Sequence, residues 1–123
     1  MSTVLAQKAK SRARRKKHIR KTVHGTPERP RLVVYRSLRQ VYAQLVDDVA
    51  GRTLTGVSSL SPELRDALAD KKPSEVCMAV GEACARKAVA MNITQVVFDR
   101  NGFPYHGRVK AVAEGARKGG LQF

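Results

Sequence analysis

The uneven distribution of positive charge constrains the fold of this chain more than any other feature. Residues 1–31 contain 11 Lys and Arg residues and one acid, Glu28, whereas residues 32–123 contain 13 basic and 9 acidic residues. Between residues 8 and 24, Ile19 and Val23 are the only sizeable apolar side chains. Such a segment buries too little apolar surface to offset the entropy lost on ordering. We therefore expect residues 1–24 to form a basic arm that is disordered, or helical only against a polyanion.

The rest of the chain has the composition of an ordinary domain. Residues 25–30 form a linker that contains Gly25, Pro27 and Pro30. Residues 31–123 are predicted to form one globular domain, which is long enough to bury a core without disulfides or metals. The net charge of +14 disfavours a compact monomer and suits a polyanionic partner.

The first part of this domain is predicted to be a β-meander. Residues 31–36 and 40–46 have the composition of two strands joined by a short polar turn around Ser37–Arg39. In the second strand, apolar residues alternate with Gln40, Tyr42 and Gln44, which predicts one apolar and one polar face. Another turn leads to a third strand over residues 52–59.

The second part alternates helix and strand. Ser61 and Pro62 are typical of a helix start, which predicts a helix over residues 61–70. Apolar residues at helical spacing predict longer helices over residues 73–92 and 106–118. The apolar run at residues 94–100 predicts an inner strand covered on both faces. The expected fold is α/β (α+β mixed), a four-stranded mixed sheet with helices packed on one face, preceded by the basic arm.

Several classes of site are not expected. The chain has no run of about 18 apolar residues, so we predict no membrane span. Cys77 and Cys84 are seven residues apart in a predicted helix, or about 10 Å along its axis, which exceeds the roughly 7 Å limit for a disulfide. Both are interpreted as small buried residues of a reducing compartment. We expect no metal, no cofactor and no small-molecule substrate, because neither ligand spacing nor a phosphate-binding loop is present.

The sequence GFPYHGRV at residues 102–109 has two interpretations. In an enzyme, Asp99 and His106, with Arg100 and Arg108 nearby, would cleave a phosphodiester by general acid–base chemistry. No second carboxylate and no nucleophile motif supports that hypothesis. In a binding surface, Gly107 would let a partner's backbone approach and the start of the last helix would face a phosphate.

The roles of the aromatic side chains differ from one to the next. Tyr105 and His106 either stack on a ribose or base, or pack against the neighbouring strand, and composition alone does not decide between these. Tyr42 lies on the polar strand face and is predicted to contact a partner. Tyr35 shares a face with Val33 and is predicted to belong to the core.

The chain resembles the bacterial large-subunit ribosomal protein eighteen family over essentially its whole length. The resemblance is carried by RARRKKHIRK, GTPERPRL, RLVVYRSLRQVYAQLVDD and the ending VVFDRNGFPYHGRVKAVAEGARKGGLQF. It implies a protein that is not an enzyme, that binds 5S ribosomal RNA, and that helps attach it to the large subunit in the central protuberance. It also implies 23S ribosomal RNA and a second 5S-binding ribosomal protein as neighbours, in the cytoplasm.

Carried onto this sequence, the resemblance implies RNA contacts from the arm, the hairpin and the turn. The predicted contact residues are Arg12, Arg14, Arg15, Lys16, Lys17, Arg20, Lys21, Arg31, Arg36, Ser37, Tyr42, Gln44, Arg100, Tyr105, His106, Gly107 and Arg108. The arm is expected to supply nonspecific attraction, and the sheet face and turn to select the RNA. A general nucleic-acid chaperone or DNA-binding protein is the alternative, since the arm alone would suffice for it.

Overall fold

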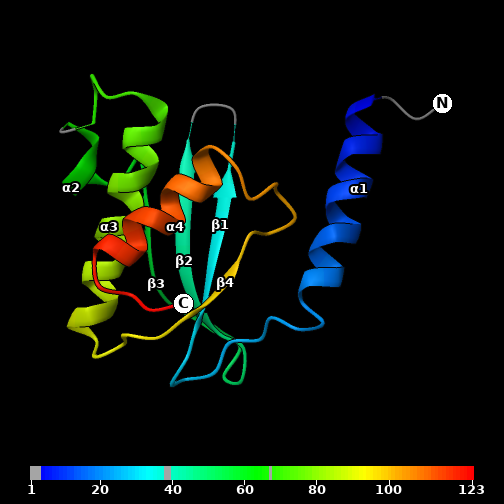
Figure 1. Cartoon of the computed structure of the whole chain (residues 1–123), viewed down its shortest axis with the longest axis horizontal. Helices are drawn as coiled ribbons and strands as arrows, with labels where there is room; N and C mark the ends of the chain where they lie inside the picture. The colour runs from blue at the N-terminus through cyan, green and yellow to red at the C-terminus, as the bar shows by residue number, and fades with distance from the viewer. Residues whose placement is uncertain (1–3, 38–39, 67) are drawn as a thin grey trace.

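The chain folds into a four-stranded sheet with helices on one side and a separate N-terminal helix on the other. The computed structural model describes residues 4–37, 40–66 and 68–123. The elements, in order, are α1 (Val4–Ile19), β1 (Arg31–Arg36), β2 (Val41–Asp47), β3 (Arg52–Ser58), α2 (Pro62–Arg65), α3 (Pro73–Ala90), β4 (Val97–Asp99) and α4 (Arg108–Lys118) (Figure 1). The predicted mixed sheet is confirmed. Residues 38–39 of the predicted hairpin turn lie outside the described residues.

The sheet has the strand order β3-β2-β1-β4, with β4 parallel to β1 and the other neighbours antiparallel. In the β1–β2 ladder Leu32 pairs with Leu45 and Val34 with Ala43, and these side chains are fully buried. The alternate residues of both strands point to the other face. The alternation read from the sequence therefore sets which face of the sheet becomes core.

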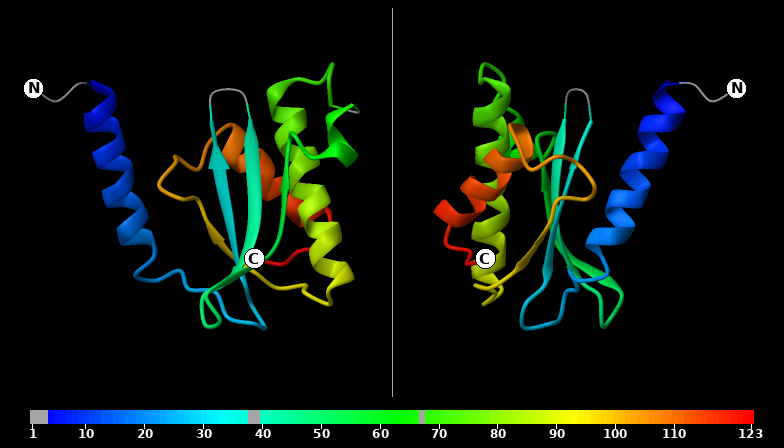
Figure 2. Two further views of the ribbon diagram at one scale, coloured as in Figure 1. Left: turned by 180° about the vertical axis from the view of Figure 1, so that it is seen from behind. Right: turned by 45° about the vertical axis from the view of Figure 1, so that its right-hand side comes forward.

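Helices α3 and α4 cover the apolar face, which we call the helical face (Figure 2). They approach each other closely at two glycines. A Cβ added at Gly81 would lie 2.1 Å from the Val112 carbonyl oxygen, and one at Gly115 would lie 2.1 Å from the Met78 carbonyl oxygen. Only glycine fits at these two positions, so the small residues of both helices let their backbones touch.

Two predictions about elements differ from the structure. The strand predicted over residues 94–100 is shorter, and β4 lies at the edge of the sheet instead of inside it. Val97 and Phe98 are accordingly half-buried rather than buried. The helix predicted over residues 61–70 begins at Pro62 as expected but ends at Arg65.

Helix α1 lies on the opposite side of the sheet from α3 and α4 (Figure 2). None of its residues is buried, and its first turn contains no acid. Residues 1–24 were predicted to be a basic arm, and Val4–Ile19 of that segment are helical in the structure. This helix has no core of its own, and its position depends on a few side-chain contacts.

Neither a membrane span nor a metal cluster appears in the described part of the chain. No helix there is long and apolar enough to cross a membrane. Residues 4–37, 40–66 and 68–123 contain no group of three or more His, Cys, Asp or Glu side chains placed to hold a metal ion. Cys77 and Cys84 are free and buried, as predicted, and burial raises the pKa of Cys84 to about 11.

Candidate nucleic-acid interface

The turn that follows β4 places α1 against the domain. Asn101 and Gly102 have positive φ values of 55° and 78°, and the Phe103 amide donates to the Arg100 carbonyl oxygen at 3.0 Å. Asn and Gly are residues that favour such a tight bend. A Cβ at Gly102 would lie 2.6 Å from the Arg12 carbonyl oxygen, so glycine is required there for contact with α1 as well as for the turn.

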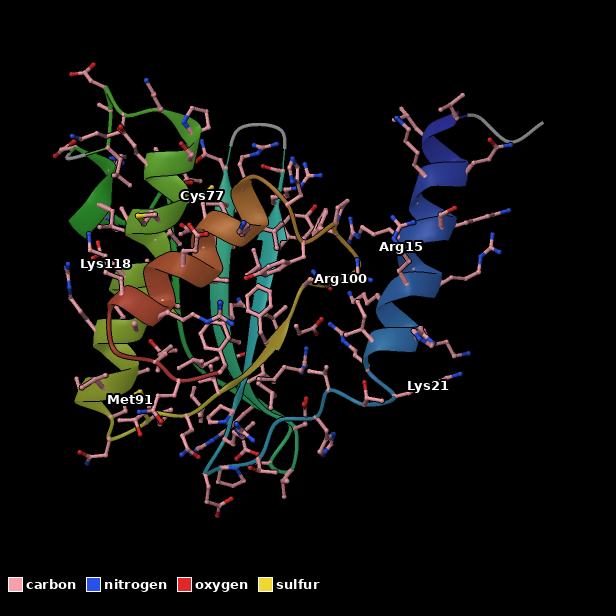
Figure 3. The ribbon with its side chains drawn as sticks, viewed as in Figure 1. Arg15, Lys21, Cys77, Met91, Arg100 and Lys118 are labelled. Carbon is pink, nitrogen blue, oxygen red and sulfur yellow. The ribbon has the colours of Figure 1, made fainter. Side chains whose placement is uncertain are left out.

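Two arginines of α1 hold the helix to this turn. Arg15 Nε donates to the Gly102 carbonyl oxygen at 2.9 Å (Figure 3 labels Arg15 beside the loop of Arg100). The Arg12 guanidinium lies 4.5 Å from the centroid of the Phe103 ring and 5.4 Å from that of Tyr35. These are cation–π distances. Arg12 and Arg15 are predicted RNA contacts, and in the structure they also attach the arm to the domain.

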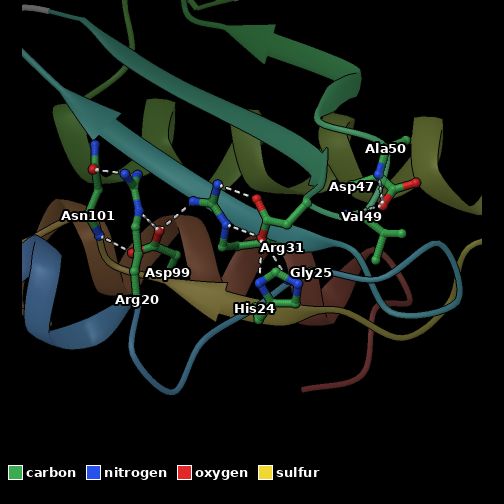
Figure 4. Close-up of polar contacts among 10 residues, drawn as sticks. Arg20, His24, Gly25, Arg31, Asp47, Val49, Ala50, Asp99 and Asn101 are labelled. Carbon is green, nitrogen blue, oxygen red and sulfur yellow. Dashed lines mark hydrogen bonds and ion pairs between the residues drawn. The ribbon is translucent and has the colours of Figure 1, made fainter.

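An ion-pair network ties the end of α1, β1 and the turn together (Figure 4). It consists of Arg20, Asp99, Arg31 and Asp48. Asp99 is fully buried, and its Oδ2 accepts from Arg31 Nη1 at 2.6 Å and from Arg20 Nε at 3.2 Å. Its Oδ1 accepts from the Asn101 amide at 2.8 Å. The network therefore neutralises a buried carboxylate and fixes the point at which the arm leaves the domain.

The same network secures the linker through Asp48. Arg31 donates to both oxygens of Asp48, at 2.9 and 3.0 Å, and the Gly25 amide donates to Asp48 Oδ2 at 2.7 Å. The hydrogen bonds from Arg31 are the largest cause that lowers the pKa of Asp48, to about 2. Hydrogen bonding to Asp48 and Asp99 in turn raises the pKa of Arg31. Both groups are charged at neutral pH and serve the fold.

This network corrects two hypotheses from the sequence. Arg31 is only 8% exposed and its guanidinium is bonded to Asp48 and Asp99, so it is not part of the interface that we propose. Asp99 has both oxygens occupied and no exposed surface, so it is not placed to act as a base with His106. The hypothesis of phosphodiester cleavage therefore lacks the carboxylate that it requires for general acid–base chemistry.

The face of the sheet opposite the helical face, which we call the open face, carries polar and aromatic groups. Tyr35 pairs with Tyr42, and Val33 with Gln44, in the β1–β2 ladder, so these four side chains share that face. The two tyrosine rings lie 6.0 Å apart between centroids. Tyr35 is 42% exposed, so the prediction that it belongs to the core is wrong.

A groove of ≈ 620 Å³ lies between α1 and the open face. Its lining residues are Lys16, Arg20, Val33, Tyr35, Ser37, Tyr42, Gln44 and Asn101. The groove brings together five of the predicted contact residues, from the arm and the hairpin, on two facing walls. Burial, followed by the neighbouring charges of Arg20 and Arg12, lowers the pKa of Lys16.

Eight cations of α1 and of the two residues that follow it divide between two sides, and all except Lys10 were predicted contact residues. Arg12, Arg15, Lys16 and Arg20 meet the turn, the network or the groove. Lys10, Arg14, Lys17 and Lys21 recur at spacings of three and four residues, and all four are exposed. The arm thus presents one row of cations to the domain and another to solvent.

The residues of the 100–108 turn form a second cluster beside the hairpin. Arg100 Nη1 donates to the Phe103 carbonyl oxygen at 2.9 Å, while Tyr105 packs edge-on against Phe98 with ring centroids 5.7 Å apart. Tyr105 is nevertheless 44% exposed, and His106 is exposed. Neither lines the groove.

Arg108 links the turn cluster to the hairpin. Its Nη1 donates to the Ser37 carbonyl oxygen at 3.3 Å, at the end of β1. Gly107 has a positive φ of 56°, and an added Cβ would meet nothing within 4 Å. Its glycine is therefore explained by backbone conformation, and the close backbone approach in this turn occurs at Gly102, against Arg12.

Sequence reasoning missed part of this geometry. Phe103 was not singled out, yet it contacts Tyr35, Arg12 and Arg36, the last with its guanidinium 5.0 Å from the ring centroid. The only signal in the sequence was an apolar residue directly after Asn-Gly, in a turn otherwise rich in polar residues. The sequence suggests Asp99 only as a catalytic candidate. Its role in a buried ion pair could not be predicted, because the sequence does not show that Arg20 and Arg31 lie near it.

The acidic residues are segregated from the open face. Asp47 accepts from the turn amides of Val49 and Ala50, and Asp48 and Asp99 are neutralised by arginine. Glu28 lies in the linker. The remaining acids are Glu63, Asp66, Asp70, Glu75, Glu82 and Glu114, all in the segment from α2 to α4. The open face and α1 are therefore cationic, while the helical face carries both signs.

Known proteins resemble this chain over nearly its whole length. The family model described as ribosomal L18 of archaea, bacteria, mitochondria and chloroplasts matches residues 6–123. The large ribosomal subunit protein uL18 of Herpetosiphon aurantiacus is 55% identical over 112 residues, which cover 91% of this chain and 93% of that protein. That of Symbiobacterium thermophilum is 53% identical over 115 residues, 93% and 94% of the two chains. That of Dictyoglomus turgidum is 50% identical over 122 residues, 98% and 100% of the two chains.

Proposed function

Since this chain belongs to the ribosomal L18 family, we propose that it binds 5S ribosomal RNA and helps to attach it to the large subunit in the central protuberance. The uL18 proteins are structural components of the large ribosomal subunit, which lies in the cytoplasm of bacteria, and they are not enzymes. The proposal adds the particular RNA and its place in the subunit, with 23S ribosomal RNA and a second 5S-binding protein as neighbours.

The separation of charge across the sheet is the observation that carries this proposal. Among the described residues, α1 and the open face combine basic and aromatic side chains, and the nearby carboxylates are paired or accept from turn amides. A polyanion that approaches this side meets no exposed acid of the sheet. Phosphate contacts supply most of the affinity in such complexes.

We assign two roles to the interface. The solvent row (Lys10, Arg14 and Lys17 of α1, and Lys21 just after it) contacts phosphates, and these contacts attract any RNA. The open face with Arg36, Ser37, Tyr42 and Gln44, and the turn with Arg100, Tyr105, His106, Gly107 and Arg108, contact the shape and loops of one RNA. The mixed-charge helical face, which includes Glu82 and Glu114, is the surface that we assign to a protein neighbour.

A competition titration tests the proposal. Labelled 5S ribosomal RNA is titrated with the full chain in the presence of excess transfer RNA, for the natural protein and for Arg108→Ala and Lys17→Ala. We expect the natural protein to retain 5S ribosomal RNA. Arg108→Ala should reduce the preference, while Lys17→Ala should weaken both RNAs alike.

Equal binding of 5S ribosomal RNA and transfer RNA by the natural protein would contradict the proposed partner. An equal loss of preference in both variants would contradict the division of roles. Incubation with labelled RNA, with and without magnesium, separates the cleavage alternative, which requires loss of full-length RNA that His106→Ala abolishes.

A further inference from the structure

The groove between α1 and the open face has two chemically different walls. Lys16 of α1 and Arg20, just after its end, line one side. Tyr35, Tyr42 and Gln44 line the sheet side, with exposed or half-buried rings and an exposed side-chain amide. Among the residues that the structure describes, no carboxylate lines the groove. One wall therefore offers positive charge, and the other offers aromatic faces and hydrogen-bonding groups.

Contacts with the domain hold the cationic wall in place. Arg20 is bonded to the buried Asp99, and Arg12 and Arg15 attach the middle of α1 to Phe103 and Gly102. Lys16 lies between these arginines, and its pKa is lowered by burial and by the charges of Arg20 and Arg12. An anion in the groove would relieve this repulsion, so the site favours a phosphate beside Lys16.

The sheet wall requires a ligand with accessible aromatic faces. Bases in a duplex are stacked on one another, and their faces are closed to a protein side chain. Unpaired bases can stack on Tyr rings and expose their edges to amide groups. A charged groove that follows the backbone, combined with aromatic rings for the bases, is the general arrangement for single-stranded RNA.

We propose that this groove binds an unpaired segment of RNA, with phosphates toward Lys16 and Arg20 and bases on Tyr42 and Tyr35. The inference deepens the proposed function and rests on it only in taking RNA as the partner. It assigns the solvent row to paired RNA, and Lys16 and Arg20 to an unpaired strand. Gln44 is exposed in the groove, where its amide meets base edges or riboses.

The test compares two forms of the same probe. A short single-stranded oligoribonucleotide and the same strand annealed to its complement are titrated against the full chain at one salt concentration. The variants are Tyr42→Leu, which removes the ring, and Tyr42→Phe, which keeps it. Phe123→Leu is the matched control, because Phe123 is a half-buried aromatic residue like Tyr42 but lies outside the groove and outside the residues assigned to RNA.

We expect Tyr42→Leu to weaken the single strand by roughly five- to 150-fold, the range for loss of one base–aromatic stack. The duplex should change less than about twofold, and Tyr42→Phe should bind like the natural protein. Phe123→Leu should leave single-strand binding unchanged. Gln44→Ala provides a second variant at an exposed position, where loss of folding is not expected, and should also weaken only the single strand.

Equal losses for strand and duplex, or no loss in either groove variant, would overturn the inference. The outcome is independent of which RNA the protein prefers. A protein that binds the single strand through Tyr42 but does not prefer 5S ribosomal RNA would retain the groove assignment and lose the proposed partner. Preference for 5S ribosomal RNA without any effect of Tyr42→Leu and Gln44→Ala would retain the proposed partner and reject the groove assignment.

Discussion

Asp99 is the residue on which the arrangement of arm and sheet depends most. Its carboxylate is fully buried between Arg31 and Arg20. Breaking a buried ion pair costs about 3–5 kcal/mol when the remaining charge has no other partner. Because Arg31 keeps its ion pair with Asp48, we expect Asp99→Ala to lower the free energy of unfolding in urea by about 3 kcal/mol, the lower end of that range. Asp70→Ala, at an exposed turn position, should change it little, and equal effects of the two variants would contradict the assignment.

Asp48 makes stability depend on acid pH. Its folded pKa of about 2 lies below the ordinary value of 3.8. The stability that this ionised carboxylate contributes is therefore complete above about pH 4 and is lost as the pH falls toward about 2. In that interval the unfolded chain binds a proton at Asp48 while the folded protein does not. The difference in unfolding free energy between the natural protein and Asp48→Asn should shrink by about 2 kcal/mol over that interval. A difference that stays constant between these pH values would show that the carboxylate is not stabilised by Arg31.

At the scale of elements, the crossing of α3 and α4 depends on glycine. An alanine normally stabilises a helix relative to glycine by about 0.5–1 kcal/mol. At Gly115 the added Cβ would collide with the Met78 carbonyl, and such overpacking costs about 1–3 kcal/mol. Gly115→Ala should therefore lower the free energy of unfolding, whereas Glu114→Ala on the exposed side should not. A gain in stability for Gly115→Ala would mean that the helices are not in contact there.

The hairpin could be predicted from sequence because its pattern is local. Alternation along residues 40–46 identifies the apolar face, and the ladder follows from it. The place of β4 could not be predicted, because strand order depends on where the connection after α3 returns to the sheet. The length of α2 was also missed. Its Pro62 is exposed and its Leu64 is half-buried, so little packing extends the helix beyond Arg65.

The candidate site was predicted in part for the same reason. Tyr42 was placed on the open face by its polar neighbours Gln40 and Gln44. Tyr35 is predicted to be in the core because it lies on the same strand face as Val33. The strand pattern does not show which face of the sheet other elements cover. Arg31 was counted as a surface cation, since the sequence does not show that Asp48 and Asp99 converge on it.

At the scale of the whole molecule, the chain joins a helix without a core to a domain with one. α1 has no buried residue and is held to the domain by Arg12, Arg15 and Arg20. Lys16 and Arg20 line the groove, whereas the solvent row faces away from the domain. If affinity comes from the arm and selection from the domain, the two should be separable by salt. About six arm contacts to phosphate predict a slope of log affinity against log salt on the order of −4 to −5.

A salt-resolved titration of 5S ribosomal RNA, with transfer RNA as competitor, tests this central claim most directly. It compares the full chain with a version that lacks residues 1–24. We predict that the shorter chain binds more weakly and with a smaller salt slope but still prefers 5S ribosomal RNA, because the open face and the 100–108 turn make the selection. Loss of the preference together with the arm would contradict the account and would place specificity in α1.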